Sequence, residues 1–216
     1  MKQIIIAVVV VVGIIVGAMM LGGNDDSSTA GAVSNNFYGQ ENGVVTLTEY
    51  ADFQCPACGQ FYPLVKQLKE NFKDQVRFEF KHFPLVQIHP NATTAHRASQ
   101  AAANQGKFWE MHDILYEQQQ SWSDSTSAST IFESYAKQIG LDVEKYKLDA
   151  ASSDVIAIIN ADISAGKSLN VSGTPTFFID GKKIDDTSSI ATVEGFTKVI
   201  QDAIDAKQPS SETPQQ

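Results

Sequence analysis

The sequence has only two cysteines in 216 residues, Cys55 and Cys58. Two cysteines cannot form the set of disulfides that stabilises a small disulfide-rich scaffold. Basic clusters are equally scarce: the net charge is −9, and Lys182-Lys183 is the only adjacent basic pair. A chain with this charge distribution is not expected to bind nucleic acid.

Groups of metal-ligating residues are also lacking in the sequence. No second cysteine pair exists, and the histidines form no tight cluster; they are His82, His89, His96 and His112. A metal site would need ligands beyond the one cysteine pair. We therefore expect no bound cofactor. The remaining composition is ordinary, because 43% hydrophobic and 19% charged residues allow a globular core of normal size.

A long apolar run, Ile4 to Leu21, carries no charge. As a helix, it would span roughly 27 Å, close to the hydrocarbon thickness of a bilayer. Lys2 precedes the run, and Asp25 and Asp26 follow it. We therefore expect residues 1–3 in the cytoplasm, residues 4–22 as an uncleaved anchor, and the remainder outside the cell membrane. The alternative is a signal peptide cleaved near residues 30–32.

Two segments have little apolar content to bury. Residues 23–43 are rich in Ser, Gly, Asn and Asp, and we expect them to form a flexible spacer. Residues 208–216 are rich in Pro, Ser and Gln, and we expect a disordered tail. The folded domain is therefore expected over residues 44–207.

Strand and helix patterns alternate along this domain. The run Val44 to Phe53 is rich in β-branched and aromatic residues and places Val45, Leu47 and Glu49 on one face of a strand. Apolar spacing predicts a helix over residues 59–72 and a strand over residues 76–83. Further strands are predicted over residues 176–180 and 183–184, and a last helix over residues 192–207.

The segment of about residues 85–169 is predicted to be mostly helical. Its expected helices cover residues 91–105, 107–118, a segment opening with a capping box at 130–133, a short helix capped by Asp142, and residues 154–169. The order β-α-β, helical block, β-β-α predicts an α/β fold, a mixed sheet flanked by helices with a helical insertion.

The segment Cys55-Pro56-Ala57-Cys58 lies where the first strand gives way to the first helix. A cysteine pair at this spacing and position is typical of a redox dithiol. Cys55, at the helix start, would meet unpaired N–H groups and the positive end of the helix dipole, which stabilise a thiolate. Pro56 suits the first helical position. Cys58, one turn further, is expected to be buried and to act as the resolving thiol.

Two other interpretations of the pair remain open. A structural disulfide would close too short a loop to restrict the unfolded chain much. A metal half-site could be completed by a second copy of the chain. Glu49, six residues before Cys55 on the buried strand face, is a candidate proton acceptor for Cys58, or else a carboxylate paired with a lysine.

The chain resembles the DsbA-like branch of the thioredoxin superfamily, including its membrane-anchored bacterial members. The residues that carry the resemblance are 49–53, the motif Cys55-Pro56-Ala57-Cys58, and Gly173-Thr174-Pro175-Thr176, with support from residues 80–84 and 106–112. The resemblance covers about residues 44–207. It implies a thioredoxin fold with an inserted helical domain and a cis Pro175 facing the dithiol.

The resemblance also implies roles for the site residues. Cys55 would be the attacking cysteine and Cys58 the resolving one, while Pro56, Ala57, Thr174 and Pro175 would contact substrate. Backbone pairing beside Pro175 would recognise an extended segment by strand addition. The strong oxidases of the family have His where Ala57 stands, and that departure puts a strongly oxidising potential in doubt.

We expect an extracytoplasmic, membrane-tethered protein dithiol–disulfide oxidoreductase that introduces disulfides into exported proteins. Its partners would be exported proteins with free thiols and, by analogy, a quinone-linked membrane oxidase that recycles the Cys55–Cys58 pair. Oxidation is favoured outside the cytoplasm, where no glutathione pool keeps thiols reduced. The alternatives are a reductase or isomerase of exported proteins, and a tethered chaperone that binds peptides without redox chemistry.

Overall fold

The computed structural model describes residues 32–208 of the chain. The expected anchor at residues 4–22 and nearly all of the expected tail lie outside this range. Within it, no helix is both long and apolar enough to cross a bilayer. The strands are β1 (Asn36–Gly39), β2 (Val45–Ala51), β3 (Val76–His82), β4 (Thr176–Ile179) and β5 (Lys182–Lys183).

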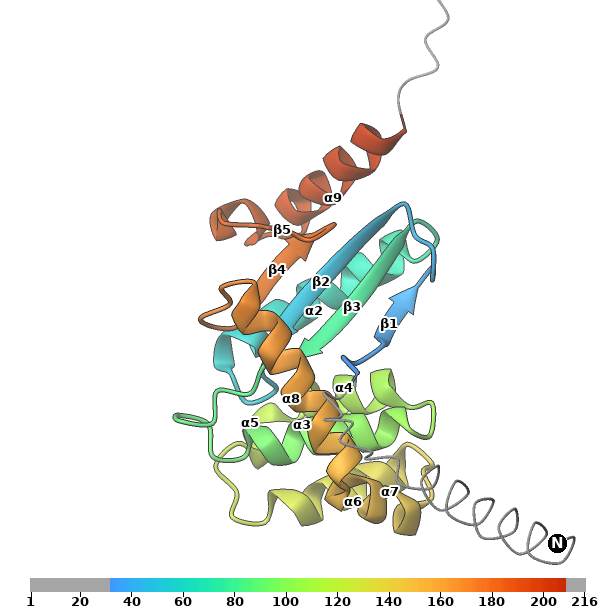
Figure 1. The fold of residues 1–216 in the computed structure, drawn as a ribbon, viewed down its shortest axis with the longest axis vertical. Helices are drawn as coiled ribbons and strands as arrows, with labels where there is room; N and C mark the ends of the chain where they lie inside the picture. The colour runs from blue at the N-terminus through green and yellow to red at the C-terminus, as the bar shows by residue number, and fades with distance from the viewer. Residues whose placement is uncertain (1–31, 209–216) are drawn as a thin grey trace, which may run out of the picture. The chain divides into compact units, whose positions relative to one another are not determined.

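The strands form one mixed sheet in the order β1-β3-β2-β4-β5. Only β2 and β3 are parallel, and they flank α2 (Pro56–Phe72) in the sequence. The other helices are α3 (Ala92–Ala103), α4 (Phe108–Glu117), α5 (Gln119–Trp122), α6 (Ala128–Gln138), α7 (Val143–Ala151), α8 (Ser153–Ser168), the 3-10 helix η1 (Thr187–Ile190) and α9 (Val193–Lys207). This arrangement confirms the predicted α/β thioredoxin fold with a helical insertion (Figure 1).

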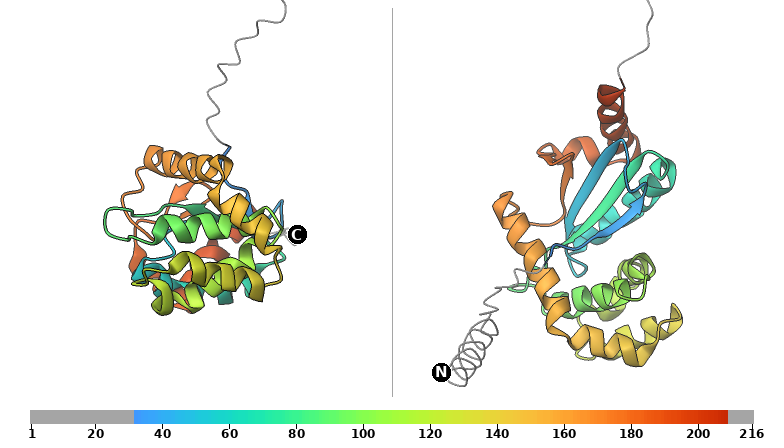
Figure 2. Two further views of the ribbon diagram at one scale, coloured as in Figure 1. Left: turned by 90° about the horizontal axis from the view of Figure 1, so that it is seen from below. Right: turned by 45° about the vertical axis from the view of Figure 1, so that its right-hand side comes forward.

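Helices pack against the sheet through two apolar clusters. One cluster joins β2, β3 and β4 to α2 and α9 through Leu47, Leu68, Phe78, Phe177 and Phe196. A smaller cluster, built on Tyr50 and Phe178, includes Ile163 of α8. The views in Figures 1 and 2 show α8 running from the helical block along the sheet. Alternating residues of the central strand thus meet different helices.

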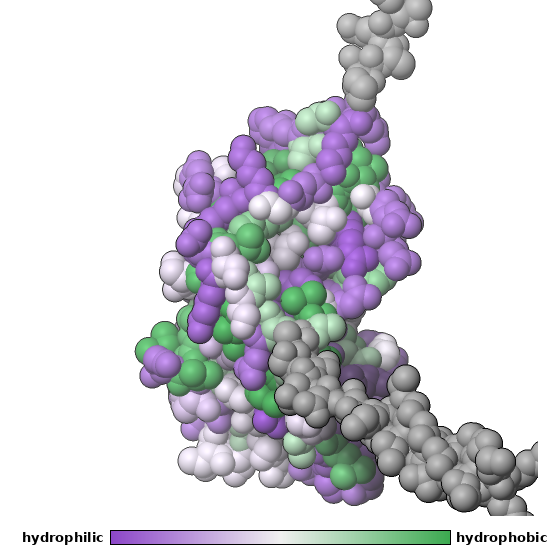
Figure 3. All heavy atoms as spheres, viewed as in Figure 1, coloured by the Kyte–Doolittle hydropathy of each residue, from purple (hydrophilic) through white to green (hydrophobic). Residues whose placement is uncertain are grey.

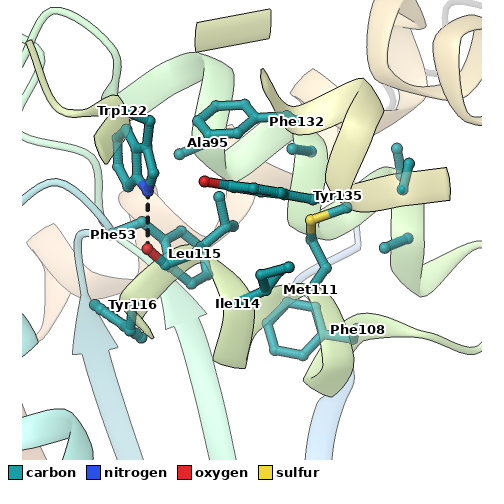
Figure 4. Packing of buried hydrophobic residues seen from close by; sticks show 14 of the residues in the cluster. Phe53, Ala95, Phe108, Met111, Ile114, Leu115, Tyr116, Trp122, Phe132 and Tyr135 are labelled. Carbon is teal, nitrogen blue, oxygen red and sulfur yellow. Dashed lines mark hydrogen bonds between the residues drawn. The ribbon is translucent and has the colours of Figure 1, made fainter. Parts of the chain in front are cut away.

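The helical block has its own core, which continues to the cysteines. Trp122 and Phe132 pack edge to face, and the Trp122 indole N–H donates to the Leu115 carbonyl at 2.8 Å (Figure 4). Phe53 stacks on Phe80 at a centroid distance of 4.8 Å. The cluster that contains these rings also contains Cys55 and Cys58. The dithiol therefore lies where sheet and helical block share one core.

The prediction of a flexible spacer over residues 23–43 is wrong from Ser34 onward. The Ser34 hydroxyl donates to the buried Asp162 carboxylate at 2.6 Å, and Asn36 donates to Gln100 at 3.0 Å. Asn36 to Gly39 then forms β1, antiparallel to β3. Buried polar contacts hold this segment in place together with β1 pairing, and composition alone does not reveal such contacts.

Most other predicted elements are confirmed within a few residues at their ends. The expected capping box at residues 130–133 is wrong, because α6 begins at Ala128 without a side-chain cap. The Asp142 cap is confirmed: its carboxylate accepts the Lys145 N–H at 3.0 Å. Glu49 is 8% exposed and shares the buried pattern of Val45 and Leu47, as predicted.

Candidate active site

Cys55 and Cys58 lie at the N-terminal end of α2, immediately after the loop that leaves β2. Cys55 is the residue that precedes the helix, with extended backbone (φ −69°, ψ 122°), and Pro56 is its first residue. The Cys55 N–H donates to the Asp52 carbonyl at 3.1 Å, which fixes the loop. Both cysteines are free thiols, 7% and 1% exposed respectively. Both cysteines are therefore buried, and Cys58 is the more deeply buried of the two.

The surroundings of Cys55 stabilise its thiolate. A hydrogen bond from the Cys58 thiol, helped by Thr174 and by the N–H groups of Cys58 and Ala57, outweighs burial and lowers the pKa of Cys55 to about 5. The backbone donors belong to the first turn of α2, where N–H groups have no partner within the helix. The helix start therefore contributes as the sequence predicts, while Cys58 contributes more than any backbone donor.

The pKa of Cys58 is shifted in the opposite direction. Burial, its hydrogen bond to Cys55 and the negative charge of Glu49 raise the pKa of the Cys58 thiol well above its ordinary range. Burial also raises the pKa of Glu49 to about 8, against the opposing charge of Lys69. Lys69, 4% exposed, lies 3.8 Å from Asp113. Glu49 is therefore a buried carboxyl that can hold a proton near Cys58 at neutral pH.

The loop before β4 faces the dithiol. The Thr174–Pro175 peptide bond is cis, as the family resemblance implies. The Cys55 sulfur lies 3.4 Å from the Thr174 carbonyl oxygen. Pro56, Ala57, Thr174 and Pro175 are all at least partly exposed. The structure thus brings together residues that are 119 positions apart in the sequence.

A groove of about 810 Å³ opens beside the start of α2. Its walls come from α2, the segment between β3 and α3, and the region of α4 and α5, and its lining is rich in amide and hydroxyl groups. Pro56 and Gly59 form part of one wall and Gln118 and Gln120 part of another. A polar groove next to Cys55 can receive the chain that flanks a substrate cysteine.

Buried polar residues around this groove were not identified from the sequence. The Asp52 carboxylate, fully buried, accepts hydrogen bonds from the Leu85 and Gln54 N–H groups at 2.8 Å each and pairs with His89 at 2.7 Å. The Gln54 side chain donates to the Ser123 carbonyl at 2.8 Å. The sequence marks Asp52 only by its place three residues before Cys55, near the end of the predicted first strand.

Gln119 of α5 is a second missed residue. Its side-chain amide donates to the carbonyls of Phe53 at 2.7 Å and Cys55 at 3.0 Å. Nothing in its sequence neighbourhood, a run of three glutamines, marks it out. Within residues 32–208, no group of three or more His, Cys, Asp or Glu side chains is arranged to hold a metal ion.

Comparison with solved structures relates the fold to oxidoreductases. A thioredoxin-like oxidoreductase from Silicibacter pomeroyi is 26% identical, with a TM-score of 0.63 over 82% of this chain and 93% of that one. BdbD from Bacillus subtilis is 21% identical, with a TM-score of 0.68 over 78% and 91%. Wolbachia pipientis alpha-DsbA1 is 20% identical, with a TM-score of 0.69 over 82% and 94%.

Curated relatives share the sequence more closely but are much longer. The chain is 39% identical over 145 residues to the Na(+)/H(+) antiporter NhaA 3 of Salinispora tropica, which covers 67% of this chain. The match spans about a fifth (21%) of that relative's length. The thioredoxin family model matches residues 32–202. The chain therefore belongs to the thioredoxin family, and its fold is the DsbA-like form with an inserted helical region.

Proposed function

We propose that this protein is a thiol–disulfide oxidoreductase that introduces disulfides into exported proteins through Cys55 and Cys58. The observation that carries the proposal is the asymmetry of the dithiol. Cys55 immediately precedes α2, its sulfur lies 3.4 Å from the Thr174 carbonyl, and its pKa is lowered. Cys58 is 1% exposed, and its pKa is raised. Such a pair has one thiol that meets the substrate and one that resolves the intermediate.

The reaction transfers two electrons from the substrate to the protein. A substrate thiolate attacks the Cys55 sulfur of the oxidised pair, the Cys55–Cys58 bond breaks, and Cys58 leaves as a thiolate that takes up a proton. A second substrate thiolate then attacks the substrate sulfur of the mixed disulfide. Cys55 leaves as a stabilised thiolate, so the substrate is oxidised and the protein is reduced.

Glu49 is the proposed proton donor to the departing Cys58. Its pKa of about 8 keeps it largely protonated at neutral pH, and its charge, once it is ionised, is felt at Cys58. The same carboxyl can take the proton back when Cys58 attacks during reoxidation. The exposed backbone around Thr174 and Pro175 is the proposed dock for an extended substrate segment.

The low pKa of Cys55 supports oxidation as the direction. A stabilised thiolate favours the reduced protein and makes the disulfide a better oxidant. A value of about 5 lies between those of thioredoxin, about 7, and DsbA, about 3.5. We therefore expect a reduction potential between about −270 and −120 mV, the values of those two proteins.

The proposed setting is outside the cytoplasmic membrane, with residues 4–22 as the anchor. The uncharged run from Ile4 to Leu21 supports this placement. Oxidation there would need an acceptor for the electrons, and a quinone-linked membrane oxidase is the proposed recycling partner. Cell fractionation with protease accessibility tests the location, and N-terminal sequencing of the mature protein distinguishes an anchor from a cleaved signal peptide.

Two cysteine variants and one titration test the proposal. Cys55→Ser should abolish oxidation of a reduced, unfolded protein. Cys58→Ala, mixed with a protein that already contains a disulfide, should accumulate the mixed disulfide formed when the Cys55 thiolate attacks that disulfide and releases the other substrate sulfur as a thiolate. A potential near −270 mV in a glutathione buffer would instead favour a reductase. Retained function of Cys55→Ser in cells would favour the chaperone alternative.

A further inference from the structure

The short helix α5 contacts the catalytic loop through the side chain of Gln119. The Gln119 amide nitrogen donates to the Phe53 carbonyl at 2.7 Å and to the Cys55 carbonyl at 3.0 Å. A carboxamide NH₂ has two hydrogens, so it can serve two acceptors at once. These two carbonyls lie on either side of Gln54, in the loop that carries the reacting cysteine.

The other end of α5 is held firmly. Trp122 is fully buried, packs on Phe132 and donates its indole N–H to the Leu115 carbonyl. The Gln119 carbonyl in turn accepts the Ser123 N–H at 3.0 Å. The side chain of Gln119 therefore extends from a fixed part of the helical block.

Gly59 leaves space for this contact. A Cβ atom at residue 59 would lie 2.5 Å from the Gln119 side-chain oxygen, closer than real Cβ contacts, and 3.1 Å from its Cδ, which is a tight contact. Gly59 lies inside α2, where alanine is the better helix former. A larger residue at position 59 would therefore displace the end of the Gln119 side chain.

We propose that Gln119 is a positioning residue, whose carboxamide clamps the Phe53 and Cys55 carbonyls and keeps the Cys55 sulfur facing the N–H groups at the start of α2. The Cys55 carbonyl also accepts the Gly59 N–H at 3.1 Å, so the clamp acts on the residue that opens the helix. Loss of the clamp frees the backbone around Cys55 and weakens the contacts that favour its thiolate. The inference rests on the proposed function, in which Cys55 is the attacking thiol.

Replacing the donor while keeping the side chain's length tests the clamp. In the full-length reduced protein, Gln119→Met should raise the pKa of Cys55 by about one unit, a tenfold change in its ionisation. Alkylation of Cys55 should then slow about tenfold below pH 5 and reach the same plateau near pH 8. Cys58 does not interfere, because it is buried and its pKa is raised. Gln138→Met, on the exposed surface of α6, should leave the profile unchanged.

A second variant leaves Gln119 in place and displaces it. Gly59→Ala should shift the pKa of Cys55 in the same direction, and should add no further shift in the Gln119→Met background. If Gln119→Met fails to fold, the shift in the pKa of Cys55 in Gly59→Ala alone tests the clamp. The clamp would be overturned if Cys55 titrated unchanged in Gln119→Met. It would also be overturned if Gly59→Ala shifted the pKa of Cys55 equally in the wild-type protein and in Gln119→Met. Retained activity of Cys55→Ser would instead overturn the assignment of the attacking thiol.

Discussion

At the scale of single residues, reactivity depends on what surrounds the Cys55 sulfur. Thr174 lies against it and contributes to the pKa of about 5. Its buried hydroxyl has no hydrogen-bond partner among the described residues, so it is free to donate to the Cys55 thiolate. We therefore expect Thr174→Val to raise the pKa of Cys55 by about one unit, since valine keeps the shape and removes the donor.

The ultraviolet absorbance of the thiolate, followed against pH, measures this change directly. Thr176→Val is a matched control, because the Thr176 hydroxyl donates to the Gly173 carbonyl at 2.7 Å rather than to sulfur. It should leave the titration near the wild-type value. An equal shift in both variants would mean that valine acts by disturbing the loop and not by removing a donor.

Glu49 gives a second prediction at this scale. Burial holds the pKa of Glu49 at about 8, so its protonated form, the proposed donor to Cys58, is lost as pH rises through 8. The breaking of the Cys55–Cys58 bond by a thiol should therefore slow above pH 8. Glu49→Gln should slow this step at least tenfold at pH 7 and remove the pH dependence, within the range of general acid catalysis.

Stopped-flow fluorescence of the oxidised protein with a small thiol reports this step, since Trp109 and Trp122 belong to the same helical block. Glu110→Gln, on the exposed surface of α4, is the matched control and should retain the wild-type rate. A Glu49→Gln variant with an unaltered rate and profile would exclude Glu49 from proton transfer.

At the scale of elements, Asp52 joins β2 to the segment before α3. Its carboxylate accepts the Leu85 N–H at 2.8 Å and pairs with His89 at 2.7 Å. Burial opposes the charge, yet His96, His89 and Leu85 lower the pKa of Asp52 to about 2. The depressed pKa means that Asp52 stabilises the fold above about pH 4, and that this stability is lost as pH falls through 2.

Asp52→Asn should therefore lower the free energy of unfolding by on the order of 2 kcal/mol at neutral pH. Urea denaturation at several pH values measures the difference, which should shrink between pH 4 and pH 2. Asp124→Asn, an exposed residue on the rim of the same groove, should change stability little. A difference that stays constant down to pH 2 would mean that packing, and not charge, accounts for the loss.

The elements also show what the sequence can predict. Period-two alternation placed Glu49 on the buried face of β2, and the cysteine spacing placed the dithiol at the start of α2; both are local patterns. Gln119 and β1 have no such pattern. Gln119 acts on carbonyls 64 and 66 residues away, and β1 is held by polar contacts with Asp162 and Gln100. Polar contacts across long separations leave no periodicity to detect.

At the scale of the whole molecule, the surface is mixed. Over the face shown in Figure 3, polar residues predominate, with an apolar patch over the loop between β3 and α3. Val86 and Ile88 of that loop are 53% and 68% exposed. Beneath this surface, one apolar cluster includes both cysteines and most of the helical block. We therefore expect the redox state of the dithiol to affect the stability of the core that contains it.

The stability of the reduced protein should depend on pH, and this dependence can be measured. The folded protein lowers the pKa of Cys55 to about 5, so ionisation of Cys55 stabilises the reduced form fully above its unfolded pKa, and this stability is lost as pH falls through 5. The reduced protein should thus gain stability relative to Cys55→Ser between pH 5 and pH 8. The slope cannot exceed about 1.4 kcal/mol per pH unit, and solvent near the sulfur makes it smaller.

The lowered pKa of Cys55 also predicts whether the oxidised or the reduced protein is the more stable. If the folded environment favours the thiolate, the disulfide is more oxidising in the folded protein than in the unfolded one. The oxidised protein should then unfold at lower urea concentration than the reduced protein at pH 7, although a disulfide ordinarily stabilises a fold. Because Cys55 and Cys58 close a very short loop, that ordinary gain is small. A more stable oxidised form at pH 7 would contradict an oxidase and favour a reductase.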